Sequence, residues 1–184
     1  MKHLSVRLLV ACAAVALFHT AFSAPPSADA ALTRAETIAQ TDDFRRTTWR
    51  FQELMGKRRT PTNYMERRTT DQAFRVWVRN LWLRRAAAVR RQAQNPPHRD
   101  EWMCIHRHER DPAQGWRTRT GNGYYGGLQM DLTFQRMYGP ELLRRKGTAN
   151  NWTPAEQMWI AERAYRSGRG FHPWPNTARY CGLI

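Results

Sequence analysis

The chain has 184 residues, which is enough for one sizeable domain and an appended segment but not for several domains. Its hydrophobic content of 41% is ordinary for a globular protein, whereas its formal charge of +15 is not. The charge comes almost wholly from arginine, because lysine occurs only at Lys2, Lys57 and Lys146. A surface this basic attracts polyanions, and charge alone does not distinguish nucleic acids, anionic lipids and acidic wall polymers.

Residues 1–30 have the pattern of a secretory signal peptide. The segment begins with positive charge at Lys2 and Arg7, continues with an apolar stretch over 8–18, and ends in small residues. The apolar stretch is too short to span a bilayer, so we expect cleavage within 23–31. No later segment is apolar enough to span, which predicts that the mature chain has no transmembrane segment. The sequence thus predicts an exported protein.

Residues 31–97 contain two arginine-rich helical patterns. The first runs from Leu32 to Met55, and the second opens with a candidate capping box at Thr69–Gln72. Together they predict an antiparallel helical hairpin. We interpret its arginines as a solvated face, since an exported chain rarely meets DNA or RNA, and we expect no nucleic acid partner. The predicted apolar stripes are Phe44, Thr48, Phe51 and Met55 in the first helix and Phe74, Trp77, Val78, Leu81, Trp82, Ala88 and Val89 in the second.

A second domain, 98–184, is predicted to follow the segment NPPH. Its first helix covers Asp100–His108 and places Trp102 and Ile105 on one face, with Glu109 on the same face at the helix end. The pair Asp111-Pro112 then ends the helix. Burial disfavours the charged form of a carboxyl group, so a glutamate here is suited to hold a proton near neutral pH. The general acid of glycosidic bond cleavage needs a proton held in this way.

The segment TGNGYYGG at 120–127 predicts a short β-hairpin or an irregular loop. Its tyrosines are followed by hydrogen-bonding side chains at Gln129, Asp131 and Thr133. Aromatic faces with amides and hydroxyls beside them suit sugar rings, which have apolar faces and polar edges. A structural turn with core tyrosines fits the same pattern equally well.

Cleavage of the signal peptide removes Cys12 and leaves Cys104 and Cys181. Two thiols in an exported chain are most simply a disulfide, because that compartment does not keep them reduced. A zinc site is the alternative, but the histidines show no compact ligand spacing with both cysteines. We therefore expect neither a metal nor an organic cofactor.

The segment TGNGYYGGLQM, followed by AEQMWIAERAYRSGRGF and PWP, resembles the transglycosylase-like domain of resuscitation-promoting factors, a branch of the lysozyme superfamily. The resemblance covers Asp100–Cys181 and implies a mainly α, lysozyme-like domain in a secreted or wall-associated bacterial protein. In that family the catalytic Glu directly follows the first cysteine, whereas four residues separate Cys104 from Glu109 here. The second cysteine is also displaced by four residues, to six after Pro175. A shared shift predicts that the disulfide has moved but is intact.

The resemblance implies that Glu109 is the general acid and base for the β-1,4 bond between N-acetylmuramic acid and N-acetylglucosamine. Peptidoglycan glycan strands are the expected substrate, with acidic wall polymers as a further partner. Attack by water and attack by the sugar's own 6-hydroxyl remain open. Two alternatives are a catalytically silent wall-binding module and an arginine-rich interaction protein. The candidate sugar contacts are Trp116, Tyr124, Tyr125, Gln129, Asp131, Thr133 and Trp174.

Overall fold

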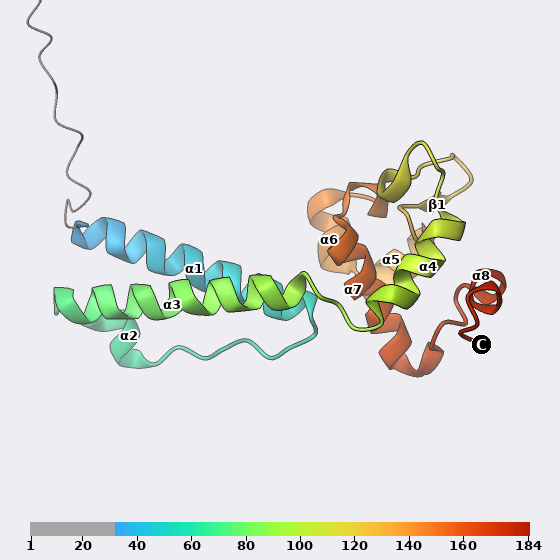
Figure 1. Cartoon of the computed structure of the whole chain (residues 1–184). Coiled ribbons are helices and arrows are strands. Elements are labelled where there is room, and N and C mark those ends of the chain that lie inside the picture. Colours follow the sequence, from blue (N-terminus) through green and yellow to red (C-terminus); the bar gives the residue numbers. More distant parts are fainter. Residues whose placement is uncertain (1–31) are drawn as a thin grey trace, which may run out of the picture. The chain divides into compact units, whose positions relative to one another are not determined.

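The computed structural model describes Leu32–Ile184, so the predicted signal peptide at residues 1–30 lies outside the described residues. The described chain is mainly α-helical with one two-stranded sheet, as predicted (Figure 1). Within this range no helix has both the length and the apolarity to cross a membrane. The helices and strands are α1 (Arg34–Leu54), α2 (Tyr64–Arg68), α3 (Gln72–Ala93), α4 (Arg99–Glu109), β1 (Tyr124–Tyr125), β2 (Met130–Asp131), α5 (Leu132–Tyr138), α6 (Pro140–Lys146), α7 (Pro154–Ala164) and α8 (Pro175–Tyr180), with short helical turns η1 (Gly115–Arg117), η2 (Ala149–Asn151) and η3 (Tyr165–Arg169).

The two long N-terminal helices lie side by side, but the antiparallel direction predicted from the sequence is wrong. α1 and α3 run in the same direction (Figure 1). Near their starts, Gln72 Nε2 donates to Thr37 Oγ1 over 3.3 Å. Just beyond the end of α1, Lys57 Nζ donates to Gln92 Oε1 over 3.0 Å. Both pairs are separated by 35 residues, and a constant separation along the helices is the signature of parallel packing.

A return segment at 55–71 makes this parallel pairing feasible. The 21-residue helix α1 is about 31 Å long, and an extended chain covers about 3.3 Å per residue, so the segment can travel back along the helix. It is held there at Thr60, whose N–H donates to Gln52 Oε1 and whose carbonyl accepts from Trp49 Nε1. In the sequence this segment is only a break between two helical patterns, and its length does not distinguish a return along the helix from a loop between antiparallel helices.

The buried face of α3 is rotated from the predicted stripe. Val78 and Trp82 are buried as predicted, but Trp77 is 51% exposed and stacks on Phe74. Arg75, which was assigned to the solvated face, is buried. The buried residues of α3 follow one another at intervals of three or four positions, so they share one face of the helix. Trp77 precedes the buried Val78 by one position and is therefore rotated about 100° away from that face. Packing against α1 therefore selects the face, and side-chain size alone does not.

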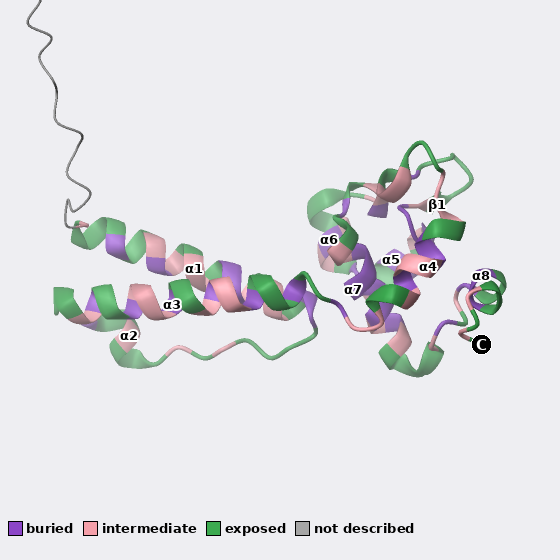
Figure 2. Ribbon diagram, viewed as in Figure 1, coloured by how far each residue is buried: buried purple, intermediate pink, exposed green. Residues whose placement is uncertain are grey.

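The core of the second half gathers around α7, which is almost wholly buried (Figure 2). Trp102, Ile105 and Ile160 are fully excluded from solvent in this core. The ends of α1 and α3 join it, and Trp159 Nε1 donates to the carbonyl of Ala93 over 2.9 Å. The core therefore packs against the buried face of α4, the helix that ends at Glu109.

The predicted short β-hairpin is confirmed in the TGNGYYGG region. β1 and β2 pair antiparallel, with Tyr124 opposite Asp131. Gly126 has a left-handed backbone, at φ +78°, and a Cβ there would collide with the side-chain amide of Gln157. A Cβ at Gly127 would collide with the ring of His106. The two glycines thus let this segment pack directly on α7 and α4.

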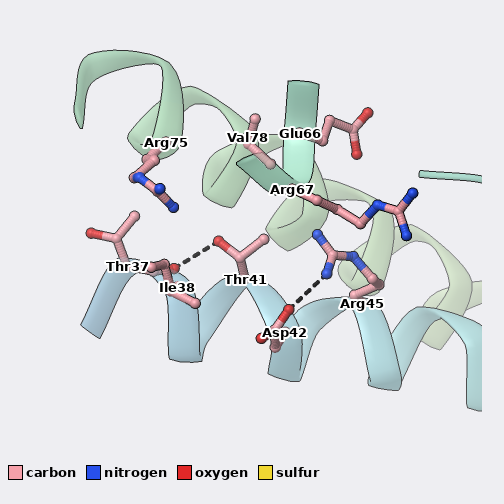
Figure 3. Close-up of a pocket in the computed structure, with 9 residues that line it drawn as sticks. All are labelled: Thr37, Ile38, Thr41, Asp42, Arg45, Glu66, Arg67, Arg75 and Val78. Atoms are coloured by element: carbon pink, nitrogen blue, oxygen red, sulfur yellow. Dashed lines mark hydrogen bonds and ion pairs between the residues drawn. The ribbon is translucent and has the colours of Figure 1, made fainter. Parts of the chain in front are cut away.

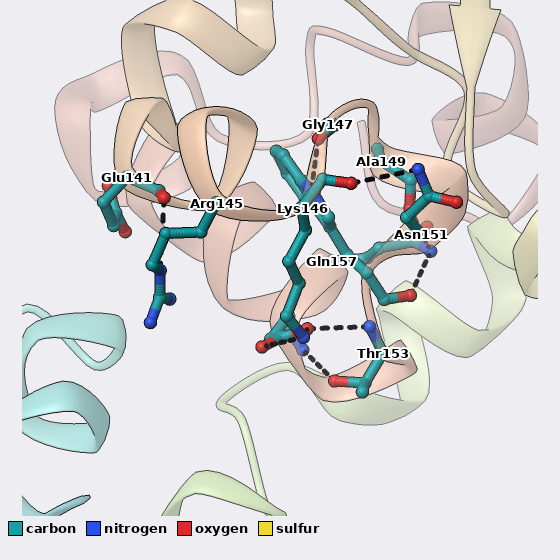
Figure 4. A network of polar contacts seen from close by, with 10 residues as sticks. Glu141, Arg145, Lys146, Gly147, Ala149, Asn151, Thr153 and Gln157 are labelled. Carbon is teal, nitrogen blue, oxygen red and sulfur yellow. Dashed lines mark hydrogen bonds and ion pairs between the residues drawn. The ribbon is translucent and has the colours of Figure 1, made fainter.

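Gln157 is the residue of α7 that fixes the neighbouring loops. It is fully buried, and its Nε2 donates to the carbonyls of Trp116, Ala149 and Trp152 over 2.8, 2.9 and 3.1 Å. Figure 4 shows Gln157 beside Ala149, with Lys146 reaching toward Thr153 at the start of the helix. Gln157 therefore has a structural role in holding the segment around Trp116.

Candidate active site

The structure places Glu109 at the last position of α4, as the helical pattern predicts. The helix buries Trp102, Ile105 and His106 and ends just before Asp111. Glu109 lies half-buried, so the carboxyl group is less enclosed than the sequence led us to expect. The side chain is therefore partly accessible to solvent.

A second element, α8, supplies a hydrogen-bond partner for this carboxylate. The buried hydroxyl of Thr177 donates to Glu109 Oε1. Four residues further along, Cys181 forms the predicted disulfide with Cys104, with the Cα atoms 6.1 Å apart. The later residue of α4 pairs with the earlier residue of α8, so the two segments cross antiparallel at two fixed points. Glu109 is thus anchored by a hydrogen bond and, one to two helical turns away, by a covalent bond.

His108 lies beside this bridge and packs on the ring of Tyr180 at 4.2 Å. Ligand atoms of Cys104, His108 and Cys181 lie within 4.8 Å of one another. Because the two sulfurs are bonded to each other, they are not free to act as thiolate ligands. Cys104 and Cys181 thus form a disulfide, as predicted from export to an oxidising compartment.

Five of the predicted sugar contacts line one pocket of about 310 Å³ between the β-hairpin, α5 and the start of α8. Exposed groups in it are Tyr124, Thr133, Met137 and Arg169. The polar and aromatic mixture is of the kind that binds sugar rings. The five predicted residues that the structure brings together here are Tyr124, Gln129, Asp131, Thr133 and Trp174.

Three of these pocket residues also have structural roles. Trp174 is 5% exposed, and its Nε1 donates to the carbonyl of Leu128 over 2.6 Å. Asp131 caps α5, since its Oδ1 accepts from the N–H of Phe134 over 2.6 Å. Gln129 has a left-handed backbone, at φ 47°, and its Nε2 donates to the carbonyl of Gly126. Trp174 and Asp131 therefore form part of the wall of the pocket, and their polar groups are already used within the protein.

The remaining predicted residues, Glu109, Trp116 and Tyr125, do not line this pocket. Tyr125 is half-buried and packs against the core. Trp116 is also half-buried, and its ring stacks on His106 with centroids 3.8 Å apart and planes 8° from parallel. The link between Glu109 and the pocket runs through α8, which carries Trp174 at its start and Thr177 within it.

His106 joins α4 to the hairpin. Its Nδ1–H donates to the carbonyl of Gly127 over 3.0 Å. Burial lowers the pKa of His106 below its ordinary value, and the hydrogen bond to Gly127 opposes this shift. The positive charges of Arg110 and Arg107 lower the pKa further. A neutral imidazole is therefore part of the packing between the helix that carries Glu109 and the ring of Trp116.

The loop RDPAQG, which follows Glu109, is a tightly hydrogen-bonded turn. Asp111 Oδ1 accepts from the N–H groups of Ala113 and Gln114, each over 2.9 Å. The N–H of Asp111 donates to Thr118 Oγ1, and Thr118 Oγ1 donates to the carbonyl of Gly115. The segment between Glu109 and Trp116 is therefore an ordered turn.

Thr177 and Arg169 are the neighbours of the site that the sequence prediction missed. A signal for Thr177 existed, because it precedes Cys181 by one helical turn and so lies on the same face as the bridge. Arg169 lies in the turn η3, where Gly168 at φ 92° interrupts the helical backbone. In the sequence, only the glycines on either side of Arg169 indicate that the helix ends before this arginine.

Comparison with known proteins agrees with this geometry. Residues 97–177 match the family model of the transglycosylase-like domain. Over 64 residues the chain is 39% identical to resuscitation-promoting factor RpfE of Mycobacterium tuberculosis. This stretch is 35% of this chain and 34% of RpfE. The match thus spans about a third of the relative's own length, and no solved structure matches significantly. Residues 97–177 are thus similar to the transglycosylase-like domain, and a stretch of 64 residues is similar to a resuscitation-promoting factor, as the sequence resemblance implied.

Proposed function

We propose that this protein is an exported enzyme that cleaves the β-1,4 bond between N-acetylmuramic acid and N-acetylglucosamine in peptidoglycan. The observation that carries the proposal is the placement of Glu109. It is half-buried at the end of α4 and hydrogen-bonded by Thr177, within a transglycosylase-like domain. Neither a metal nor an organic cofactor has a part in the proposed mechanism.

Glu109 acts first as the general acid. Its Oε1 accepts from Thr177, so the proton is carried on Oε2 and passes to the bridging oxygen of the glycosidic bond. The bond from C1 of N-acetylmuramic acid to that oxygen breaks, and the other sugar leaves with a free 4-hydroxyl. Positive charge develops on the ring as an oxocarbenium-like centre. The carboxylate that remains on Glu109 stabilises this charge.

Glu109 then acts as the base. The carboxylate removes a proton from the nucleophile that attacks C1, which restores the acid for the next cycle. If the nucleophile is water, the product is a reducing sugar. If it is the 6-hydroxyl of the same sugar, the product is a 1,6-anhydro ring. We propose that the pocket at the β-hairpin binds neighbouring sugars of the strand, with Tyr124, Gln129 and Thr133 as the available contacts.

The accompanying proposals concern the rest of the chain. Residues 1–30 direct export and are removed, and an oxidising compartment agrees with the Cys104–Cys181 bridge. The region 31–97 forms an arginine-rich appendage to the catalytic domain 98–184. Its exposed arginines, which include Arg84 and Arg90, supply positive charge for contact with acidic wall polymers.

The test compares wild type with Glu109→Gln on purified peptidoglycan, with mass spectrometry of the released fragments. Loss of a general acid costs about 100-fold or more in rate, so the variant should release almost nothing. Glu101→Gln is the matched control, because it makes the same chemical change in the first turn of the same helix. Anhydro or reducing ends in the fragments identify the nucleophile.

Each failure has a definite meaning. Equal release by wild type and Glu109→Gln removes Glu109 from the mechanism. Binding of both proteins to peptidoglycan without release of fragments by either supports a catalytically silent wall-binding module instead. Binding of wild type that disappears when the arginines of α3 are replaced assigns that binding to the arginine-rich region.

A further inference from the structure

A pocket of about 250 Å³ lies between the N-terminal parts of α1 and α3 and the short helix α2, outside the transglycosylase-like domain. Figure 3 shows Arg75 reaching from α3 toward Thr37, with Arg45 and Arg67 on the other side of Thr41. Its lining residues are Thr37, Ile38, Thr41, Asp42, Arg45, Glu66, Arg67, Arg75 and Val78. Nothing in the proposed cleavage of peptidoglycan uses this pocket.

The central feature of the pocket is the guanidinium of Arg75. The residue is only 9% exposed, and its Nε is buried without a hydrogen-bond partner in the described chain. None of the ion pairs found among Leu32–Ile184 includes Arg75. A buried N–H group without a partner is costly, because it loses hydration and gains no compensating interaction. Arg75 therefore has the donors and the charge to receive an anion from outside the chain.

The surrounding charges favour a singly charged anion. Arg45 is paired with Asp42 over 2.6 Å, which neutralises both. Glu66 is engaged by Trp82 Nε1, which donates to its Oε2 over 3.0 Å. With Arg67 and Arg75 the pocket has a small positive excess, and the nearby carboxylates oppose a dianion such as phosphate. A carboxylate is singly charged and matches the planar fork of arginine.

Apolar groups define the rest of the ligand. Ile38 and Val78 line the pocket beside the arginines. Val78 is buried and Ile38 is 38% exposed, so a small aliphatic group would gain contact there. An amino acid or the carboxyl end of a short peptide joins a carboxylate to such a group within the available volume. We propose that the pocket between α1, α2 and α3 binds the carboxylate of a small amino acid or short peptide, with Arg75 as its main anchor.

The test is calorimetric titration of the full chain with alanine and alanyl-alanine, and with acetate and inorganic phosphate as comparison anions. Arg75→Met keeps the length of the side chain and removes its charge and donors. Because a hydrogen bond to a charged group is involved, we expect affinity for alanyl-alanine to fall about tenfold or more. The control is Arg136→Met, which makes the same change at an exposed arginine of α5 that does not line this pocket and should bind like wild type.

Thermal unfolding separates binding from a structural role of Arg75. Ligand should raise the unfolding temperature of wild type but not of Arg75→Met. Without ligand, Arg75→Met should be at least as stable as wild type, because it removes an unpaired buried charge. If this variant does not fold, Arg67→Met replaces an exposed lining residue and should weaken binding about threefold. The proposal is overturned if no carboxylate binds wild type, if Arg75→Met binds equally, or if phosphate binds more tightly than the carboxylates.

Discussion

The disulfide gives the most quantitative prediction for this domain. Cys104 and Cys181 are separated by 77 residues, and the chain-entropy relation assigns a loop of this length about 4.5 kcal/mol of stabilisation. The loop contains α5, α6 and α7, so most of the domain is constrained by the bridge. Replacing both cysteines by serine should therefore remove a large share of a folding free energy that is typically about 5–15 kcal/mol.

The assay is urea unfolding followed by tryptophan fluorescence, since Trp102 and Trp174 are buried in the core close to the bridge. With a denaturant dependence of about 2 kcal/mol/M, the double serine variant should unfold about 2 M earlier than wild type. Wild type unfolded in the presence of a reductant should show the same shift. A second consequence concerns Glu109: without the bridge, the six-residue helix α8 loses its covalent link to α4, so Thr177 should hold Glu109 less firmly and activity should fall below that of folded wild type.

A shift of less than about 0.5 M would refute this reasoning, since it corresponds to roughly 1 kcal/mol. It would mean that packing around α7 and α8 holds the ends of the loop together with no help from the covalent bond. A normal shift with full activity in native conditions would refute the second step alone. The bridge would then stabilise the domain without positioning Glu109.

Three further predictions concern single contacts. Thr177→Val should lower kcat about tenfold with little change in KM, because it removes a hydrogen bond to a charged group, whereas Thr177→Ser should retain activity; equal rates for both would contradict the positioning role. Gly126→Ala should cost about 2–4 kcal/mol in urea unfolding, and Gly123→Ala, which has a similar left-handed backbone but open space, should cost about 1–2 kcal/mol, so equal losses would exclude the clash with α7. Because burial lowers the pKa of His106, the unfolded chain binds a proton more readily than the folded one, and stability should decline as pH falls below about 6.5. His106→Asn should flatten this dependence, and an unchanged slope would assign it to other groups.

The helices of this chain could be predicted from the sequence because their patterns are local. α1, α3 and α4 follow a helical spacing of side chains that acts within a few positions, and Thr33 and Asp71 cap α1 and α3, whereas α4 begins without a side-chain cap. The direction of α3 relative to α1 could not be predicted from the sequence, because it depends on the return segment at 55–71, which has no regular pattern. The exposure of Trp77 and the burial of Arg75 have the same origin, because the contact with α1 decides which face is covered.

The site divides in a similar way. The bridge followed from the number of cysteines and the compartment, and the end of α4 at Glu109 followed from helical spacing. The sequence did not show which aromatic residues are buried in the core and which line the pocket, because a tryptophan has the same sequence pattern in both places. Trp174 is mostly core, Trp116 stacks on His106, and Tyr124 is exposed at the pocket. Only the packing between distant segments distinguishes them.

The antiparallel crossing of α4 and α8 explains how the cysteines can be displaced while Glu109 keeps its surroundings. The resemblance to resuscitation-promoting factors implies cysteines at the positions that His108 and Thr177 occupy here. In this chain each cysteine lies four residues away, at Cys104 on the N-terminal side and at Cys181 on the C-terminal side. In antiparallel segments these two shifts point the same way in space, and each is about one helical turn. This chain thus has an intact bridge about one turn from the place that the resemblance implies, and Thr177, at the implied cysteine position on α8, carries the hydroxyl that donates to Glu109.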